Sequence, residues 1–225
     1  IMLIHQNSKI QVLATSKSTN RKIGAAIQLW IVPRSKTVTD SRRDKSDAKI
    51  QCKGCKLASN KGCYVGSYYV DATQRAHWRR DETPATVAQI IKLVSGKFVR
   101  FGAYGNPSLI PLRIMRLIVK HASGYAGYFH DWHLMTPAKA TNYGKYLMAS
   151  CEPDNRADAQ KLGLRTFTTR NATDPIPGND IDCPSSRGVQ CSDCQLCSGT
   201  SKKARSISIP IHGYQAKSAS RSISA

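Results

Sequence analysis

Four cysteines lie close together near the carboxyl end of the sequence, at the spacing C-x7-C-x2-C-x2-C: Cys183, Cys191, Cys194 and Cys197. Two residues between thiols let a tight turn direct both sulfurs at one ion, and four thiolates complete a tetrahedral zinc shell or hold an iron–sulfur cluster. The alternative is a set of disulfides or free thiols. Because a third cysteine at the same short interval has no role in a redox pair, the spacing favours a metal or cluster site.

A second group of cysteines has the spacing C-x2-C-x7-C: Cys52, Cys55 and Cys63. Three ligands leave one coordination position open, as a catalytic zinc or a substrate-binding iron–sulfur cluster requires. In the alternative interpretation, Cys151 or a histidine fills the fourth position and the site is structural. A further alternative is that all eight cysteines form one composite structural patch.

The middle of the chain must supply the scaffold, because strand-like and helix-like segments alternate there. Apolar and aromatic runs predict strands at 97–102, 125–129, 145–150 and 165–169, and helical spacing of apolar residues predicts helices at 108–121, 137–143 and 155–162. Strands separated by helices of about ten residues require crossover connections and therefore a parallel sheet. The predicted fold class is α/β, an open parallel sheet or a partial (β/α) barrel, with a cysteine-rich, metal-binding C-terminal segment.

Polar side chains follow each predicted strand, where parallel α/β sheets bind their ligands. These residues are Tyr104 and Asn106, then His130, Asp131 and His133, then Glu152 and Asp154, then Arg170 and Asn171. We expect them to converge at one edge of the sheet, and we take His130, Asp131, Glu152 and Asp154 as the catalytic candidates. Each alone has an ordinary interpretation: a loop histidine is commonly solvated or hydrogen-bonded, and Asp154 can simply cap the next helix.

The flanking regions complete the predicted organisation into four parts: a basic segment (1–50), the α/β body with the three-cysteine site (51–172), the four-cysteine segment with a final strand (173–213) and a basic tail (214–225). Strands are predicted at 10–15 and 204–211, with an apolar segment at 25–32. Helices are predicted at 73–80 and 83–94, the second capped by Thr83. The charged stretch 33–49 is predicted to be an exposed loop, and the tail from Gln215 to be frayed unless bound.

The formal net charge is +20, from 34 Lys and Arg against 14 Asp and Glu. A charge of this size repels itself in the folded state, and it indicates a polyanionic partner. Nucleic acid is the leading candidate, and an anionic membrane surface is the second. The candidate contact residues are Arg42, Arg43, Arg79, Arg80, Arg100, Lys202, Lys203 and Arg205. Unpaired bases could stack on the nearby aromatic rings of Tyr64, Tyr68, Tyr69, Trp78 and Tyr104, although these rings could equally be core residues.

The sequence gives no sign of a membrane location. No apolar run approaches the roughly 20 residues that a membrane-spanning helix needs, and the first residues do not form a signal-peptide pattern. The cysteine spacing favours a reducing compartment. We therefore expect a cytoplasmic protein that does not bind membranes.

With these motifs in hand, the chain resembles an uncharacterised, cysteine-rich family of proteins encoded by tailed bacteriophages. The resemblance covers residues 52–213 and rests on Cys52-x2-Cys55 leading to Gly62-Cys63-Tyr64, the turn 100–107, the segment 127–132, Met148-Ala-Ser150, the four-cysteine segment and Ile211-His212-Gly213. More loosely, the first half is similar to phage proteins related to radical S-adenosylmethionine barrels. Their signature is C-x3-C-x2-C, where this chain has C-x2-C-x7-C. The late cysteines with His212 are similar in kind to the zinc site of base-exchanging transglycosylases.

The resemblance implies a phage protein acting in the host cytoplasm, with zinc or an iron–sulfur cluster at one or two sites and S-adenosylmethionine as a candidate cofactor. The first functional hypothesis is an enzyme that modifies DNA or RNA bases. The second is a non-catalytic nucleic-acid-binding accessory factor for replication, transcription or packaging, with structural zinc. The third is an adaptor for a host protein. A body of roughly 160 residues is more scaffold than a binding finger needs, and this favours the enzyme. The absence of an established catalytic signature favours the accessory factor.

Overall fold

The computed structural model describes residues 1–16, 20–59, 61–80, 83–213 and 215–223, and within these ranges nine strands form one sheet. The strands are β1 (Met2–Gln6), β2 (Ile10–Thr15), β3 (Ala26–Pro33), β4 (Phe98–Tyr104), β5 (Gly124–Phe129), β6 (Met148–Cys151), β7 (Thr166–Arg170), β8 (Ile181–Asp182) and β9 (Ile207–Pro210). The α/β class is confirmed.

The sheet follows chain order except at its last edge, β1-β2-β3-β4-β5-β6-β7-β9-β8. The first three strands pair in antiparallel fashion, and every pair from β3 onward is parallel. The predicted parallel arrangement of the strands between residues 97 and 169 is therefore confirmed. In the described part of the chain no pairing joins β8 back to β1, so these two strands bound the sheet.

Eight α-helices lie in the described ranges. They are α1 (Val38–Arg43), α2 (Ser67–Trp78), α3 (Val87–Val94), α4 (Leu112–His121), α5 (Pro137–Gly144), α6 (Arg156–Lys161), α7 (Cys191–Cys194) and α8 (Ala216–Ile223). Short 3-10 turns are η1 (Asp47–Lys49), η2 (Pro107–Leu109), η3 (Trp132–Leu134), η4 (Pro184–Arg187) and η5 (Gly199–Ser201). No helix in these ranges is long and apolar enough to cross a membrane.

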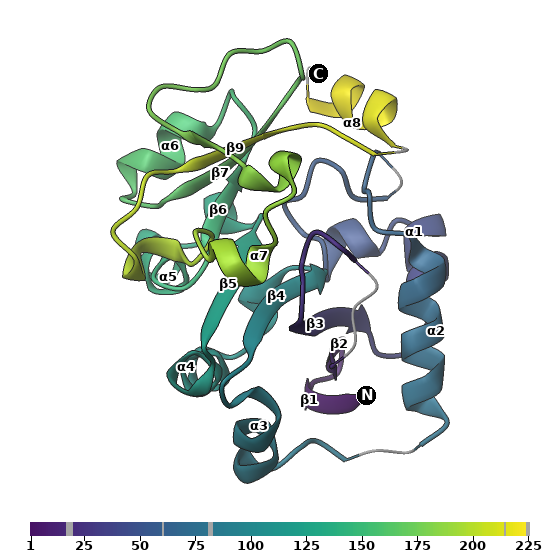
Figure 1. Cartoon of the computed structure of the whole chain (residues 1–225). Coiled ribbons are helices and arrows are strands. Elements are labelled where there is room, and N and C mark those ends of the chain that lie inside the picture. The colour runs from purple at the N-terminus through teal and green to yellow at the C-terminus, as the bar shows by residue number, and fades with distance from the viewer. Residues whose placement is uncertain (17–19, 60, 81–82, 214, 224–225) are drawn as a thin grey trace.

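The crossover helices α4, α5 and α6 all pack on one face of the sheet, which we call the helix face. Parallel strands that follow one another in order, joined by right-handed crossovers, must place their helices on the same side. Figure 1 shows α3, α4, α5 and α6 along that side, with α2 and α8 on the other. The largest core lies here, where Phe101 and Phe129 of the sheet and Met115 and Ile118 of α4 are fully buried. Each such side chain contributes roughly 1.5–3 kcal/mol by leaving water.

The opposite face is covered in a different way, by short helices and cysteine-rich segments. At one end α1 and α2 cover it, with Val38 and Val70 in a small core beside Leu13. Nearer the middle, Cys191 and Cys197 pack against Phe98 and Ala126. This covering is incomplete, and it leaves the cavity that is described below.

The charged stretch 33–49 is not the exposed loop that the sequence predicts, since it forms α1 and η1. Thr37 caps α1 locally, but a second cap comes from far along the chain: the Asp71 carboxylate of α2 accepts hydrogen bonds from the Val38 N–H (2.8 Å) and the Thr39 N–H (3.2 Å). Carboxylates at a helix N-terminus satisfy free N–H groups and favour the helix dipole. A partner 33 residues away is invisible to local patterns, so the prediction was wrong.

Two predicted helices exist but begin elsewhere. The helix expected at 73–80 begins earlier, at Ser67, and the helix expected at 83–94 begins later, at Val87. Thr86, not Thr83, is its cap: the Thr86 side chain accepts from the Gln89 N–H, and the Gln89 side chain accepts from the Thr86 N–H. This reciprocal capping box outcompetes the Thr-Pro start because it satisfies two N–H groups.

The end of the chain is also more ordered than predicted. Residues 216–223 form α8, with Ala219 and Ile223 buried. Gly62 lets this helix approach, because a Cβ at Gly62 would lie 2.5 Å from the Ala219 Cα. The tail therefore packs on the first cysteine segment instead of fraying. Within the predicted tail, residues 214, 224 and 225 lie outside the described residues.

Candidate functional site

A cavity of about 180 Å³ lies on the face of the sheet opposite the helix face, and we call it the sheet-face cavity. Alternate residues of the strands form its floor: Phe98 and Arg100 of β4, Ala126 and Tyr128 of β5, Ser150 of β6, Phe167 and Thr169 of β7, and Ile209 of β9. Its walls come from the two cysteine-rich regions and α8, through Leu57, Tyr64, Cys183, Cys191 and Ala219. The cavity thus joins parts of the chain that are far apart in sequence.

The alternation of side chains along each strand explains why polar groups reach this floor. Successive side chains of a strand point to opposite faces, so Val99 and Phe101 enter the apolar core of the helix face while Arg100 points to the cavity. The neighbouring strands are in register, with Arg100 opposite Ala126 and Ser150 opposite Phe167. The polar floor is therefore built by strand periodicity.

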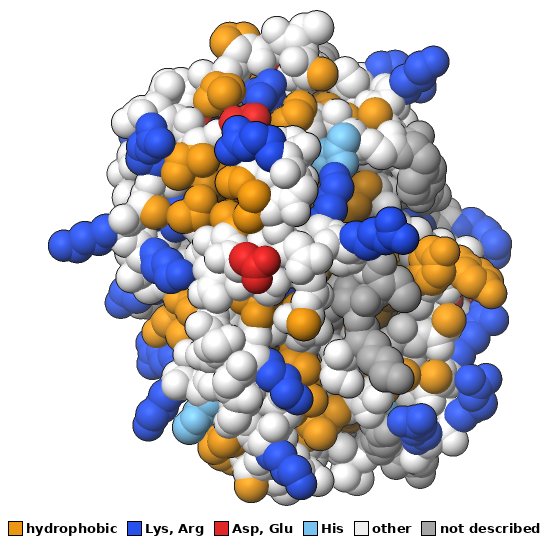
Figure 2. All heavy atoms as spheres, viewed as in Figure 1, with side chains coloured by type: hydrophobic (Ala, Val, Ile, Leu, Met, Phe, Trp, Pro, Cys, Tyr) orange, Lys and Arg blue, Asp and Glu red, His pale blue; other side chains and the backbone are white. Residues whose placement is uncertain are grey.

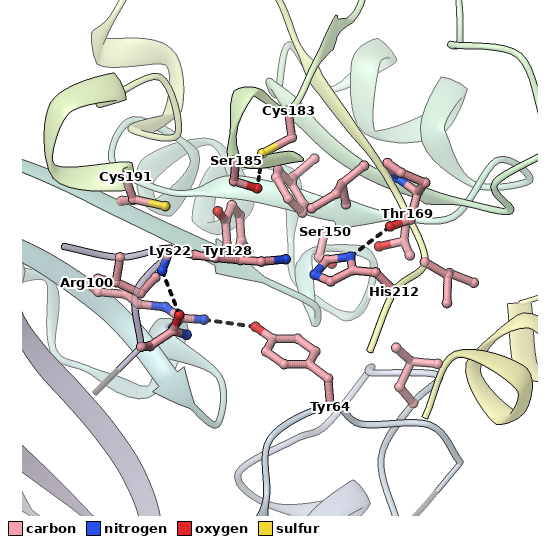
Figure 3. A pocket seen from close by; sticks show the side chains of 18 of the residues that line it. Lys22, Tyr64, Arg100, Tyr128, Ser150, Thr169, Cys183, Ser185, Cys191 and His212 are labelled. Atoms are coloured by element: carbon pink, nitrogen blue, oxygen red, sulfur yellow. Dashed lines mark hydrogen bonds between the residues drawn. The ribbon is translucent and has the colours of Figure 1, made fainter. Parts of the chain in front are cut away.

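Arg100 is the charged group at the floor of this cavity. It is only 8% exposed, and its guanidinium donates a hydrogen bond to the Tyr64 hydroxyl at 2.8 Å, which Figure 3 shows from close by. Burial opposes its charge, but the Tyr64 and Tyr128 phenols and the Cys191 thiol outweigh burial and raise the pKa of Arg100. Tyr64 itself is 53% exposed, so it lies between Arg100 and solvent.

His130, one of the predicted catalytic residues, lines the cavity at the end of β5. Asn106 fixes the backbone there, because its Oδ1 accepts a hydrogen bond from the His130 N–H at 3.0 Å. Burial lowers the pKa of the imidazole, partly offset by the carboxylates of Glu152 and Asp131. The imidazole is therefore neutral near pH 7, as a general base or a metal ligand must be.

The three candidate carboxylates lie near this edge of the sheet but are engaged by other residues. Asp131 is buried and accepts hydrogen bonds from the Ser108 hydroxyl at 2.8 and 2.9 Å, and burial raises the pKa of its carboxyl group. Glu152 accepts from the Asn155 amide at 2.8 Å. Asp154 pairs with Lys56 at 2.7 Å, and this hydrogen bond lowers the pKa of Asp154. None of the three lines the sheet-face cavity.

The predicted convergence of strand ends is thus realised in part. Asn106 and His130 meet, and Ser108 meets Asp131. His133 is exposed on η3, so the pair His130 and His133 does not share one site. Arg170 turns to the far edge, where it pairs with Asp182 at 2.9 Å.

Cys52, Cys55 and Cys63 line a second cavity of about 90 Å³, the three-cysteine cavity, which shares Leu57, Tyr64, Tyr128 and His130 with the first. Burial raises the pKa of all three thiols, that of Cys55 to about 12. Gly54 brings this loop close to the end of β5, because a Cβ there would lie 2.8 Å from the His130 carbonyl oxygen. Of the two candidates for a fourth ligand, Cys151 is buried in the core of the helix face and does not line this cavity. The histidine candidate is His130, which lines the cavity with the three thiols.

Cys183, Cys191, Cys194 and Cys197 line a third, small cavity of about 20 Å³ together with Tyr128. Burial raises the pKa of the Cys197 thiol to about 12. The Cys183 thiol lies 3.2 Å from the Ser185 hydroxyl, and in Figure 3 both Cys183 and Cys191 border the sheet-face cavity. The four cysteines of this segment therefore line one small volume.

All eight cysteines are free, so the disulfide alternative is not the one the structure adopts. In the described part of the chain, no three or more His, Cys, Asp or Glu side chains are grouped so that they could hold a metal ion. The thiols share cavities, but their sulfurs as placed do not form a ligand shell.

The predicted nucleic-acid contacts divide into buried and exposed arginines and lysines. Arg42 is buried: it donates to the Val65 carbonyl oxygen (2.9 Å) and the Cys63 sulfur (3.1 Å), and it lies over the Tyr104 ring. Arg100 lies in the cavity, as described above. The exposed residues are Arg43, Arg79, Arg80, Lys202, Lys203 and Arg205. Figure 2 shows many Lys and Arg side chains along both sides of one face, with acidic side chains sparse.

Among the aromatic candidates, Tyr64, Tyr68 and Tyr69 are exposed and Tyr104 is buried.

Most of the cavity floor was not predicted from the sequence, because the candidate residues were sought at the positions that follow each strand and not within the strands. Tyr128, Ser150 and Thr169 were not among the predicted site residues, yet they line the cavity. The available signal was a polar or charged residue at alternate positions of an apolar strand, as Arg100 stands between Val99 and Phe101.

Comparison of the chain with protein-family models, with curated proteins and with solved structures found no match.

Proposed function

We propose that this protein is a nucleic-acid-modifying enzyme whose sheet-face cavity receives one unpaired nucleotide. One observation carries the proposal: a protein of net charge +20 has a cavity with a buried guanidinium, phenols and hydroxyls on its floor. A purely electrostatic binder needs surface charge but no such cavity. Enzymes that act on a base draw the nucleotide out of the stack into a pocket of this kind.

The size of the cavity suits a small occupant. Drug-sized ligand pockets have volumes of roughly 300–1,000 Å³, and this cavity, of about 180 Å³, is smaller. Phe98, Tyr128 and Phe167 supply ring surface on its floor, against which a base can pack. Tyr64 offers a further ring toward solvent.

Within this cavity His130 is the group suited to proton transfer. Its neutral imidazole can accept a proton near pH 7, while the carboxylates of Glu152 and Asp131 favour the charged form that results. These two carboxylates therefore act in the proposal as groups that tune His130. Asp154 is paired with Lys56 outside the cavity.

The two cysteine sets supply the proposed metal. Cys183, Cys191, Cys194 and Cys197 share one cavity, and Cys52, Cys55 and Cys63 share another beside His130. Zinc or an iron–sulfur cluster would fit the donor chemistry of either set. For an iron–sulfur cluster at the three-cysteine set, S-adenosylmethionine is the cofactor that the resemblance implies.

Metal analysis of the purified protein tests this part. We expect zinc or iron in the native protein, and we expect Cys194→Ser to lower both the metal content and the melting temperature, since a bound metal contributes folding free energy. Cys151→Ser, in the core of the helix face, is the control that should retain the metal. A metal-free native protein, or a Cys194→Ser variant with unchanged metal content and melting temperature, would rule out the site.

The enzymatic proposal is tested by incubating the protein with DNA and RNA and analysing the digested nucleosides by mass spectrometry. We expect one nucleoside of altered mass, and its loss in His130→Ala. His133→Ala, at an exposed histidine three residues away, is the matched control and should remain active. Binding should weaken by roughly 10³–10⁵-fold between 50 and 200 mM salt if six to ten phosphates are contacted. Salt-insensitive binding would contradict a nucleic-acid partner.

A non-catalytic accessory factor is the second candidate, and one observation favours it. All three predicted carboxylates are held by Ser108, Asn155 or Lys56, and none lines the cavity. Under this alternative, salt-dependent binding persists and no nucleoside changes mass. The two measurements together therefore separate the candidates.

A further inference from the structure

Arg100 differs from the other buried arginines of this protein in how its guanidinium is satisfied. Arg165 donates to the Gly199 and Arg205 carbonyl oxygens at 2.8 and 2.6 Å. Arg170 donates to Asp182 and to the Asp174 carbonyl oxygen. Arg42 donates to a carbonyl oxygen and a sulfur and lies over an aromatic ring. Each of these side chains is engaged by at least two acceptors of the fold.

Arg100 is just as buried, but among the described residues it has one hydrogen-bond acceptor, the phenol of Tyr64. In the described ranges no Asp or Glu forms an ion pair with it. A guanidinium has five N–H donors in a planar fork, so donors remain that face the cavity. A buried cation without a counter-charge destabilises the folded protein unless a bound anion neutralises it.

We propose that the sheet-face cavity binds the phosphate group of a nucleotide, with Arg100 as its anchor. The choice of a nucleotide rests on the proposed function, whereas the anion site follows from Arg100 itself. Arginine matches phosphate because its fork can donate two parallel hydrogen bonds to two oxygens. Ser150 and Thr169 line the same cavity, and their hydroxyls supply further donors for a group with several free oxygens.

The placement of charge around the cavity fits a phosphate better than a neutral ligand. Lys22 lies at the cavity, and the three carboxylates of this edge, Asp131, Glu152 and Asp154, are outside its lining. The acidic groups of this edge are thus bound to other residues and do not line the cavity. Figure 3 shows Arg100 beside Lys22 on one side of the cavity, with the Tyr64 hydroxyl directed at Arg100.

One competing role for Arg100 must be separated from this one. Cys191 lies near enough to raise the pKa of the guanidinium, so Arg100 could instead balance the negative charge of thiolates that hold a metal. In that case the anion would be part of the protein, and no soluble phosphate would compete for the site. The two roles predict opposite effects of replacing Arg100.

The test compares a 5′-mononucleotide, the matching nucleoside and inorganic phosphate as probes, by calorimetry and thermal shift at constant ionic strength. We expect the mononucleotide to bind and stabilise the protein, the nucleoside to bind at least ten-fold more weakly, and phosphate to compete. Arg100→Met should weaken mononucleotide binding at least ten-fold, because a charged, bidentate contact is lost. Arg116→Met, at an exposed arginine of α4 on the helix face, is the charge-matched control and should bind normally.

The melting temperature without ligand provides the second readout. Removal of an unpaired buried charge should leave the melting temperature of Arg100→Met unchanged or higher, with unchanged metal content. If that variant fails to fold, Tyr64→Phe, which removes only the acceptor of Arg100, should still bind the mononucleotide through the retained guanidinium. Loss of metal in Arg100→Met, or equal mononucleotide binding in Arg100→Met and the native protein, would overturn the proposal.

Oligonucleotide binding, measured in parallel, distinguishes this inference from the proposed function. Arg100-dependent mononucleotide binding without oligonucleotide binding would leave the phosphate site standing and reject the polymer as substrate. Salt-dependent oligonucleotide binding that is the same in Arg100→Met and the native protein would support nucleic acid as the partner and reject the phosphate site at Arg100.

Discussion

At the scale of single residues, burial governs the chemistry of this site. The pKa of His130 is lowered by burial, and burial likewise raises the pKa of Cys55 and of Cys197 to about 12. Without a metal these thiols are protonated at neutral pH and therefore poor nucleophiles. His130 is in consequence the group of the cavity best suited to proton transfer near pH 7.

The lowered pKa of His130 predicts a specific pH dependence of stability. Because its pKa lies lower in the folded state than the 6.5 of an exposed histidine, the unfolded chain binds more protons as the pH falls through that region. The free energy of unfolding should therefore decrease as the pH drops below about 6.5. The free energy of unfolding of the His130→Gln variant should decrease less between about pH 7.5 and pH 5.5. Urea unfolding at each pH measures this difference.

His5 does not confuse this comparison, since its pKa is also lowered, by burial and then by Arg113, and it is present in both proteins. His133→Gln, at an exposed histidine, should follow the native protein. Parallel curves for the native protein and His130→Gln would mean that the histidine is not buried as described.

At the scale of elements, close packing of the cysteine loops and α8 closes the cavity. Gly62 and Gly163 both have positive φ angles, +125° and +72°. They differ in space: a Cβ at Gly62 would meet the Ala219 backbone at 2.5 Å, and a Cβ at Gly163 would meet nothing within 4 Å. A side chain at Gly62 therefore meets both an unfavourable backbone angle and the Ala219 backbone, whereas one at Gly163 meets the unfavourable backbone angle alone.

Gly163→Ala should cost about 1–2 kcal/mol of stability, from the unfavourable backbone conformation alone. Gly62→Ala should cost a further ~1–3 kcal/mol, because α8 must move to admit the methyl group. Urea unfolding of both variants measures the difference. Equal costs would show that α8 does not pack on Gly62.

Local patterns predicted the parallel body because each of its elements is self-contained. Apolar strands such as 125–129 and amphipathic helices such as 108–121 carry their own periodicity, and the crossover rule then sets their direction. The helix α1 was missed because its second cap, Asp71, is distant in sequence. The helix α8 was missed because its packing partner, Gly62, is more than 150 residues away.

The candidate site could be predicted from the sequence only in outline. The cysteine groups and His130 were found, because spacing and strand ends are local signals. The cavity floor was not, because Tyr128, Ser150 and Thr169 become neighbours only through the register of β5, β6 and β7. The sequence also did not show that neighbouring side chains engage the three carboxylates: Ser108 binds Asp131, Asn155 binds Glu152, and Lys56 binds Asp154.

At the scale of the whole molecule, the two faces of the sheet have different roles. The helix face carries the largest apolar core, while the opposite face carries the cysteines, the cavity and Arg100. Since crossover helices occupy one side only, the other side is free to be built from loops, where binding groups commonly lie. The net charge of +20 then brings a polyanion to the molecule without selecting the site.

The central claim is that nucleic acid is recognised at the sheet-face cavity, and photo-crosslinking tests it most directly. An oligonucleotide that carries one photoreactive base is irradiated with the protein, and the crosslinked peptides are mapped by mass spectrometry. We predict crosslinks to peptides that line the cavity, those containing Tyr64, Tyr128 or Cys183 to Cys191. Crosslinks confined to α3, α4, α5 and α6 on the helix face would contradict the account.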